Sequence, residues 1–272
     1  MPIGALVRSH AQHRDDSPIL EVQDASVAYD GRLALEGVSF RLDAGERVAV
    51  VGPNGAGKST LFKAIVGVLP PASGQIRVAG HGPGGHICIA YVPQRSHVDW
   101  SFPVNVADVV MMGRVGKLGW LRRPRQRDWD HVRHCLDVVC MGSMADRQIG
   151  ELSGGQQQRM FIARALAQEA ALMLMDEPLI GLDIPSQEDI FHILDVLREQ
   201  RVTVLVAIHD LNLAAERFDR VMLLKTRLLG FGKPHEVFTP QRLQAAYGSQ
   251  LHLIEGENGL MALSDTCCGG DL

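Results

Sequence analysis

Short apolar runs alternate along this chain with longer segments whose apolar residues recur at helical spacing. The runs have the composition of buried strands and occupy residues 47–51, 87–92, 171–175, 202–208 and 221–224, the last of which is expected to close the sheet. Helical faces are predicted between them, formed by Leu61, Ala64, Ile65 and Val68 and, later in the chain, by Ile190, Ile193, Leu194 and Leu197. This alternation predicts an α/β core.

The first part of the chain contains shorter strands. Residues 19–30 alternate between apolar and polar side chains and reach a turn at Asp30-Gly31, which predicts an edge hairpin with a second strand at 38–42. A further strand is predicted at 75–79, after a proline-rich helix stop. Residues 1–17 contain no apolar core segment, so we expect a disordered lead-in rather than a signal peptide.

The segment 95–150 differs in character and is predicted to be an inserted helical sub-domain. Its second helix starts near Arg125, is expected to end at Gly142 and carries an apolar face of Trp129, Val132, Leu136 and Val139. His131 and His134 fall off that face, so solvent exposure is expected for them and a metal site is the weaker alternative. The basic cluster Arg122, Arg123, Arg125 and Arg127 is expected on a solvated surface, with docking as the alternative.

These boundaries divide the chain into four parts. Residues 18–94 and 151–230 form the predicted core, 95–150 the helical insertion, 1–17 the lead-in, and 231–272 a C-terminal helix and tail. In the last part, Thr239-Pro240 caps a helix that runs through Tyr247.

Charge and cysteine content narrow the classes of function. The 272 residues include 27 Lys and Arg against 31 Asp and Glu, a formal charge of −4 that argues against nucleic acid as a partner. No uncharged apolar run approaches the ~20 residues of a spanning helix, so a membrane role is expected to need a partner protein. The odd set Cys88, Cys135, Cys140, Cys267 and Cys268 has no paired-ligand spacing and is expected to be reduced.

A glycine-rich loop follows the run 47–51 and opens the next helix. Its residues are Gly52-Pro53-Asn54-Gly55-Ala56-Gly57-Lys58-Ser59, with Thr60 next. Glycines can adopt positive φ, so the backbone N–H groups of the loop are expected to turn inward around an anion, to which the helix adds its positive end. Lys58 supplies a charge for the outer phosphates and Ser59 a hydroxyl for Mg²⁺. The loop predicts a nucleoside triphosphate site.

Polar residues follow three of the predicted strands. Gln94 is the first polar side chain after the run 87–92, Asp176 and Glu177 follow the run 171–175, and His209 follows the run 202–208. In open α/β sheets ligands bind at this edge, so these side chains are expected around one site. We predict that Asp176 holds Mg²⁺ and that Glu177 deprotonates a water. Tyr29 is placed to stack on a base, with ordinary hairpin packing as the alternative.

A second anion-facing helix terminus is predicted around Leu152-Ser153-Gly154-Gly155-Gln156. Ser153 is expected to be the N-cap of a helix that reaches about Gln168. Two phosphate-type sites in a chain with a single nucleotide loop are unexpected, unless each completes the other's site across a dimer.

The order of these motifs resembles that in the ATP-binding subunit of ABC transporters, and the resemblance covers residues 19–240. The motifs are, in chain order, the phosphate loop, Gln94, the segment 152–156, Asp176-Glu177 and His209. The resemblance implies a P-loop NTPase (RecA-like) core of the α/β class, with an antiparallel β sub-domain and the inserted α-helical sub-domain. It implies a head-to-tail dimer in which each ATP lies between one loop and the other copy's segment Ser153, Gly154, Gly155 and Gln156.

The same resemblance assigns further roles. Tyr29 stacks on adenine, Gln94 senses the nucleotide, Glu177 is the general base, His209 contacts the γ-phosphate and Asp183 lies at the dimer seam. Ser59, Gln94 and Asp176 are the implied magnesium ligands. The segment Ile180-Gly181-Leu182-Asp183 departs from the commoner Ser-Ala-Leu-Asp or Thr-Gly-Leu-Asp, but keeps the aspartate.

Residues 91–104, Met112-Gly113-Arg114 and 119–124 resemble the branch that imports manganese, zinc or iron, of which manganese is favoured. This resemblance implies a membrane permease and an external metal-binding protein as partners, at the cytoplasmic face of the plasma (inner) membrane. The alternatives are an importer ATPase for another substrate such as an iron chelate, a non-transport ABC ATPase, or a regulatory ATP-binding module without turnover.

Overall fold

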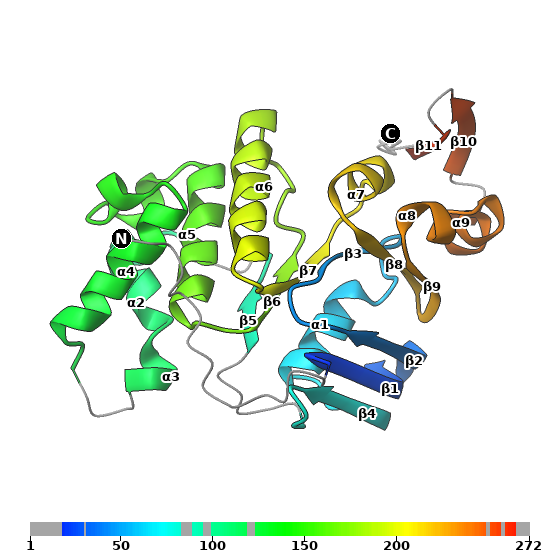
Figure 1. Ribbon diagram of the computed structural model, residues 1–272, viewed down its shortest axis with the longest axis horizontal. Helices are drawn as coiled ribbons and strands as arrows, with labels where there is room; N and C mark the ends of the chain where they lie inside the picture. The colour runs from blue at the N-terminus through cyan, green and yellow to red at the C-terminus, as the bar shows by residue number, and fades with distance from the viewer. Residues whose placement is uncertain are drawn as a thin grey trace, which may run out of the picture.

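The computed structural model describes residues 18–29, 31–82, 89–94, 99–118, 123–248, 251–256 and 259–264 (Figure 1). Several predictions therefore concern residues outside the described ranges: the lead-in 1–17, Asp30 of the first turn, residues 95–98 and 119–122 of the insertion, and Cys88, Cys267 and Cys268. Across the helices that are described, none is long and apolar enough to cross a membrane.

A six-stranded sheet in the order β5-β6-β7-β3-β8-β9 forms the centre of the molecule. All neighbours pair in parallel except β8 and β9, and the strands are β3 Arg47–Val51, β5 Ile89–Val92, β6 Leu172–Asp176, β7 Thr203–Ala207, β8 Arg220–Lys225 and β9 Arg227–Gly232. The prediction that 221–224 closes the sheet is wrong, because the chain reverses at Thr226 (φ 57°) and returns as the antiparallel edge strand β9. Most of β9 is only half-buried, so its hydrophobic signal is weak.

A second sheet, antiparallel and three-stranded, has the order β2-β1-β4. Its strands are β1 Leu20–Tyr29, β2 Arg32–Leu42 and β4 Ser73–Val78. The predicted edge position of the first strand is wrong: Leu20 pairs with Leu42 on one side and with Val78 on the other, so β1 is central. Long-range pairing of β4 decides this, and local alternation does not report it.

Helix α1 (Lys58–Val66) packs its buried residues Leu61, Phe62 and Ile65 into an apolar core shared by the two sheets. Val68 is 67% exposed, contrary to its predicted place on the buried face. The helix ends at Gly67, whose φ of 84° turns the chain away before Val68.

The segment between β5 and β6 is helical and lies to one side of the central sheet (Figure 1). It comprises α2 Val106–Met112, α3 Val115–Leu118, α4 Gln126–Val138, the 3₁₀ turns Gly142–Met144 and Ile149–Glu151, and α5 Gly154–Ala167. Helix α4 ends at Val138 rather than at Gly142, because Cys140 (φ 54°) already takes the left-handed conformation and Gly142 begins a 3₁₀ turn.

His131 corrects another prediction. Only 14% of its side chain is exposed, because Glu169, just beyond the end of α5, covers this part of α4. His134, the second histidine, is half-buried rather than exposed.

The remaining helices are α6 Ile184–Glu199, α7 Leu211–Arg217, α8 Pro234–Val237 and α9 Pro240–Tyr247. The predicted core face of α6 is buried, and Thr239 caps α9 as expected. After α9 the described chain contains an unpredicted hairpin of β10 Leu251–Gly256 and β11 Gly259–Ser264. Together these elements confirm the P-loop NTPase core with its antiparallel β sub-domain and helical insertion.

Candidate functional site

The glycine-rich loop links β3 to α1 at the carboxyl edge of the central sheet. Gly57 has φ 100°, and a Cβ there would lie 2.6 Å from Leu35 Cδ2. A Cβ on Gly52 would lie 2.1 Å from the Leu224 carbonyl oxygen. Both positions therefore require glycine. A cavity of 170 Å³ lies at the loop and is lined by Ala34, Asn54, Gly55, Ala56, Gly57, Lys58, Ser59, Thr60 and Glu177.

Lys58 is the first residue of α1 and lies beneath the loop. Its Nζ donates hydrogen bonds to the carbonyl oxygens of Gly52 (2.8 Å) and Pro53 (3.3 Å), and the side chain is buried. Burial lowers the pKa of Lys58, while the negative charges of Glu177 and Asp176 oppose that change. The loop thus holds a cation at the floor of an amide-lined cavity, an arrangement that suits phosphate.

Asp176, the last residue of β6, is buried beside this cation. Its Oδ2 accepts a hydrogen bond from the Tyr91 hydroxyl (3.2 Å), and its Oδ1 has no hydrogen-bond partner within the described ranges. Burial and the Asp176 charge raise the pKa of Tyr91, which keeps the phenol a donor. A buried carboxylate oxygen with free capacity is costly unless it meets a cation, so the residue fits a divalent metal ion.

Glu177 is held from both sides. Gln94 Nε2 donates to Glu177 Oε2 (3.0 Å), and His209 Nε2 lies 2.5 Å from Glu177 Oε1. The three residues follow β5, β6 and β7, which are adjacent strands, so the sheet order brings them together. Glu177 itself has φ 52°, a conformation that non-glycine residues seldom adopt and that clusters at functional sites. The carboxylate is oriented toward the loop cavity, where it can accept a proton.

Tyr91 is a site residue that the sequence analysis did not assign. It lies in β5, three residues before Gln94, and its hydroxyl reaches Asp176 on the neighbouring strand. The available signal was a tyrosine near the end of a buried strand that precedes a predicted site.

Ser153 begins α5 as predicted. It caps the helix in a reciprocal arrangement with Gln156, and Gly155 is packed so closely on α6 that a Cβ would lie 2.5 Å from Ser186 Oγ. Asp183 caps α6 by accepting from the Ser186 amide (3.2 Å), and hydrogen bonds from the Ser186 side chain and then from its amide lower the pKa of Asp183. None of the residues 153–156 lines the loop cavity as described.

Tyr29 ends β1 with 60% of its surface exposed, which does not fit the packing alternative. It is absent from the described lining of the loop cavity. Hydrogen bonds and charge interactions therefore link Lys58, Gln94, Asp176, Glu177 and His209. The described lining of the loop cavity includes none of Tyr29, Asp183 and residues 153–156.

Comparison with known proteins agrees with this geometry. The sequence profile of the ABC transporter family matches residues 35–180, more than half of the chain. The zinc transport system ATP-binding protein TroB of Treponema pallidum is 48% identical over 85% of this chain and 88% of its own length. The manganese transport system ATP-binding protein MntB of Bacillus subtilis is 44% identical over 87% of this chain and 95% of its own.

Solved structures show the same relationship. A chain of an ABC transporter in an inward-facing conformation superposes with a TM-score of 0.78 at 29% identity, covering 90% of this chain and 96% of that one. The resemblance seen in the sequence is thus confirmed by family, relatives and fold. This chain belongs to the ABC transporter family, as one of its ATP-binding, ATP-hydrolysing chains.

Proposed function

We propose that this chain hydrolyses ATP to power the import of a divalent metal ion through a separate membrane permease. The observation that carries the ATPase part is Glu177, which is held between Gln94 and His209 and lines the loop cavity together with Lys58. A carboxylate fixed in this way is a general base for an attacking water. Its presence also argues against a regulatory module without turnover.

We infer that ATP binds with Mg²⁺. Lys58 and the backbone N–H groups of residues 52–60, apart from Pro53, which has none, would hold the phosphates, and Ser59, Gln94 and Asp176 would hold the metal. Asp176 supports this assignment through its unpartnered Oδ1. When bound, Mg²⁺ screens the phosphate charge and orients the terminal phosphate. His209 then has two tasks, orienting Glu177 and contacting the γ-phosphate, and Tyr29 stacks on the adenine.

The active unit is a head-to-tail dimer. Ser153, Gly154, Gly155 and Gln156 present the amides of a capped helix terminus, yet they lie outside the loop cavity of their own chain. A second copy supplies the missing side of each site, with Asp183 at the seam between the copies. We also propose the domain division expected from the sequence, with 18–94 and 151–230 as the core that carries the phosphate loop and 95–150 as the helical insertion before helix α5.

Glu177→Gln tests the ATPase and the dimer together. It keeps the size and hydrogen-bonding shape of the side chain but removes the base, so ATP hydrolysis should fall by about 10³-fold. ATP should still bind and should hold two copies together, as measured by light scattering with MgATP. Retained hydrolysis would remove Glu177 from its role, and a chain that stays monomeric would contradict the shared site.

The metal assignment draws on the relatives. Their names include zinc and manganese transport systems, and the YfeB protein of Yersinia pestis, 43% identical over 87% of this chain, belongs to a chelated iron transport system. Manganese is named by several and is our first choice, ahead of zinc and iron. We place the chain at the cytoplasmic face of the inner membrane, bound to its permease, with an external metal-binding protein delivering the ion.

A transport assay separates the alternatives. The chain, co-purified with its permease and reconstituted with the binding protein, should take up ⁵⁴Mn²⁺ only with ATP, and excess Zn²⁺ or Fe²⁺ should compete less well than Mn²⁺. Uptake of an iron chelate in place of the free ion would establish the alternative importer. Failure to co-purify with any membrane protein in mild detergent would favour a non-transport ABC ATPase.

A further inference from the structure

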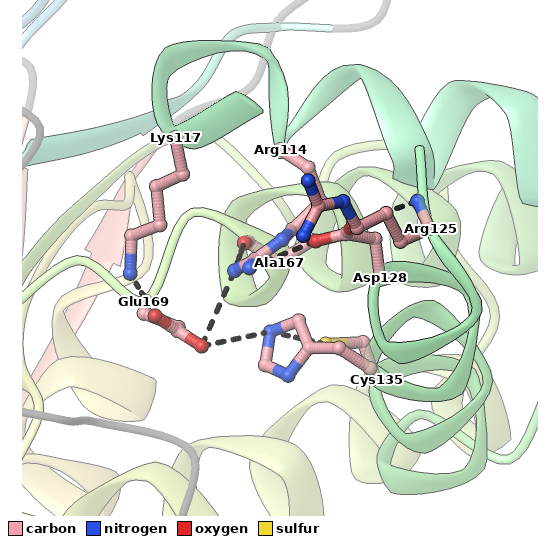
Figure 2. Close-up of polar contacts among 8 residues, drawn as sticks. Arg114, Lys117, Arg125, Asp128, Cys135, Ala167 and Glu169 are labelled. Atoms are coloured by element: carbon pink, nitrogen blue, oxygen red, sulfur yellow. Dashed lines mark hydrogen bonds and ion pairs between the residues drawn. The ribbon is translucent and has the colours of Figure 1, made fainter. Parts of the chain in front are cut away.

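A cluster of charged side chains lies among the helices that follow β5 (Figure 2), and none of its members is in the described lining of the loop cavity. Arg114 pairs with Asp128 (3.4 Å) and with Glu169 (3.2 Å), and Lys117 also pairs with Glu169. The Asp128 carboxylate is 2% exposed, and the other three side chains are 11–13% exposed. We call Arg114, Lys117, Asp128 and Glu169 the buried ion cluster.

The cluster joins three segments that are distant in the sequence. Arg114 lies between α2 and α3, and Lys117 lies in α3. Asp128 lies in the first turn of α4, and Glu169 follows the end of α5. Arg114 Nη1 also donates to the carbonyl oxygen of Ala167 (3.2 Å), the last residue of α5. A cation at this position donates a hydrogen bond to a carbonyl that has no partner within the helix, and it interacts favourably with the negative end of the helix dipole.

Two further observations show how closely the segments are fixed. A Cβ on Gly113 would lie 2.2 Å from the Arg164 carbonyl oxygen, so the end of α2 lies directly on the last turn of α5. Glu169 has φ 54°, a strained conformation for glutamate that persists when surrounding contacts hold it. The Met112-Gly113-Arg114 motif and His131, which lies 3.5 Å from Glu169, thus belong to one structural unit.

Helix α5 connects this cluster to Ser153, Gly154, Gly155 and Gln156, which we call the signature segment. Ser153 caps its N-terminal end, and the ion cluster holds its C-terminal end. A helix of 14 residues is about 21 Å long, so a tilt of about 5° at the cluster displaces the signature end by about 2 Å. Displacements of this size are enough to impair a composite active site.

We propose that Glu169 is a positioning residue that, through Arg114 and Lys117, sets the place of the signature end of α5 in the ATP-bound dimer. The apolar contacts among α2, α4 and α5 are non-directional, whereas an ion pair fixes one register between the helices. The inference rests on the proposed function, because the signature acts on the ATP of a second copy.

The test uses full-length chains carrying Glu177→Gln, in which ATP is bound but not consumed. Adding Glu169→Gln should raise the dissociation constant of the MgATP-bound dimer at least tenfold, while MgATP binding to the monomer stays within twofold. Amide hydrogen exchange should also accelerate in residues 106–118 and 154–167. The MgATP affinity of the monomer serves as the folding control, because general unfolding would lower it.

Glu46→Gln is the matched control. Glu46 also pairs with an arginine, Arg220, at 2.5 Å, and the Glu46 side chain is 21% exposed. It lies just before β3 in the central sheet, outside the helical segment. This variant should leave both the dimer constant and the exchange of residues 106–118 and 154–167 unchanged. Glu169→Asp restores the charge on a shorter side chain and should recover the dimer only in part, as expected when position matters and not charge alone.

Three results would overturn the proposal. The first is an unchanged dimer constant in Glu169→Gln, the second is an equal loss in the Glu46→Gln control, and the third is full recovery by Glu169→Asp. If the parent Glu177→Gln chain itself fails to dimerise, the proposed function fails instead. Hydrogen exchange then decides the positioning role, and unchanged exchange in residues 106–118 and 154–167 refutes it.

Discussion

Two aspartates are buried in the described part of the chain, and their surroundings differ. Asp128 accepts hydrogen bonds from the Arg125 amide (2.9 Å) and from Arg114, so both of its oxygens are engaged. Asp176 accepts only from the Tyr91 hydroxyl, and its Oδ1 has no partner among the described residues. The first carboxylate is satisfied within the protein, and the second retains capacity for something that binds.

The difference separates a carboxylate that is satisfied by folding from one that can still bind a ligand. Burial alone raises the pKa of Asp128, but the Arg125 amide and the Arg114 guanidinium outweigh it, so that the pKa is lowered and the charge is stabilised by folding. A buried carboxylate without such partners costs free energy, and this cost persists at sites where ligand binding recovers it. We therefore expect substitution of Asp176 to change activity and substitution of Asp128 to change stability.

The largest effect is expected for Asp176→Asn. The amide keeps the shape of the side chain but loses the negative charge that we propose holds Mg²⁺, so MgATP hydrolysis should fall by about 10²–10³-fold. The free energy of unfolding without nucleotide should stay equal or rise, since a poorly satisfied buried charge is removed. Phosphate release and urea denaturation measure the two quantities. A clear loss of stability would contradict the contrast with Asp128.

Asp128→Asn should have the opposite profile. It leaves Arg114 buried with one carboxylate fewer, and the free energy of unfolding should fall by about 3 kcal/mol. MgATP binding to the monomer should stay within twofold, because the loop cavity does not include α4. Urea denaturation and nucleotide titration provide the measurements. A loss below about 1 kcal/mol, the range of surface ion pairs, would show that the cluster is not a structural centre.

His131, which lies beside the buried ion cluster, makes the stability of this region depend on pH. Burial, reinforced by Arg114 and Lys117, lowers the pKa of His131 from 6.5 to about 4. Between these values the unfolded chain binds a proton that the folded chain does not, so stability falls as the pH drops below 6.5. From pH 6.5 to pH 5 this histidine should remove about 2 kcal/mol of stability. The difference between the parent and His131→Gln in urea denaturation at both pH values isolates it, and parallel curves would refute it.

The smallest effect is expected for Tyr29→Ala. Because this side chain is exposed, its loss should leave the free energy of unfolding unchanged within about 0.5 kcal/mol. Loss of stacking on adenine should weaken ATP binding by about 1 kcal/mol, or roughly fivefold. Titration with ATP, with Tyr29→Phe as the conservative control, measures this change. Equal ATP affinity in the parent, Tyr29→Ala and Tyr29→Phe chains would show that Tyr29 does not contact the nucleotide.

Local patterns in the sequence predicted much of the central sheet and the ATP cradle. The run Arg47–Val51 is a strand as predicted, and Ser153 and Thr239 cap helices as predicted. These features depend on periodicity, glycine geometry and capping, which act over a few residues. Errors arose where distant segments meet: β1 proved central because β4 pairs with it, and β9 was missed because it is only half-buried.

The candidate site residues show the same division between local signals and long-range pairing. Gln94, Asp176, Glu177 and His209 were identified from their places after buried strands, since parallel strands end at one edge of a sheet. Gln94 contacts one carboxylate oxygen of Glu177 and His209 contacts the other. This arrangement depends on the strand order β5-β6-β7, which no local sequence pattern specifies.

The sequence by itself therefore determined which residues are candidates for the site, because loops, caps and strand ends depend on short segments. Only the tertiary structure decided which charges are satisfied and which are free. His131 was expected in solvent and lies against Glu169, 38 residues further along the chain. Burial and charge pairing depend on every segment that surrounds a group, so they emerge when the helices and sheets pack together.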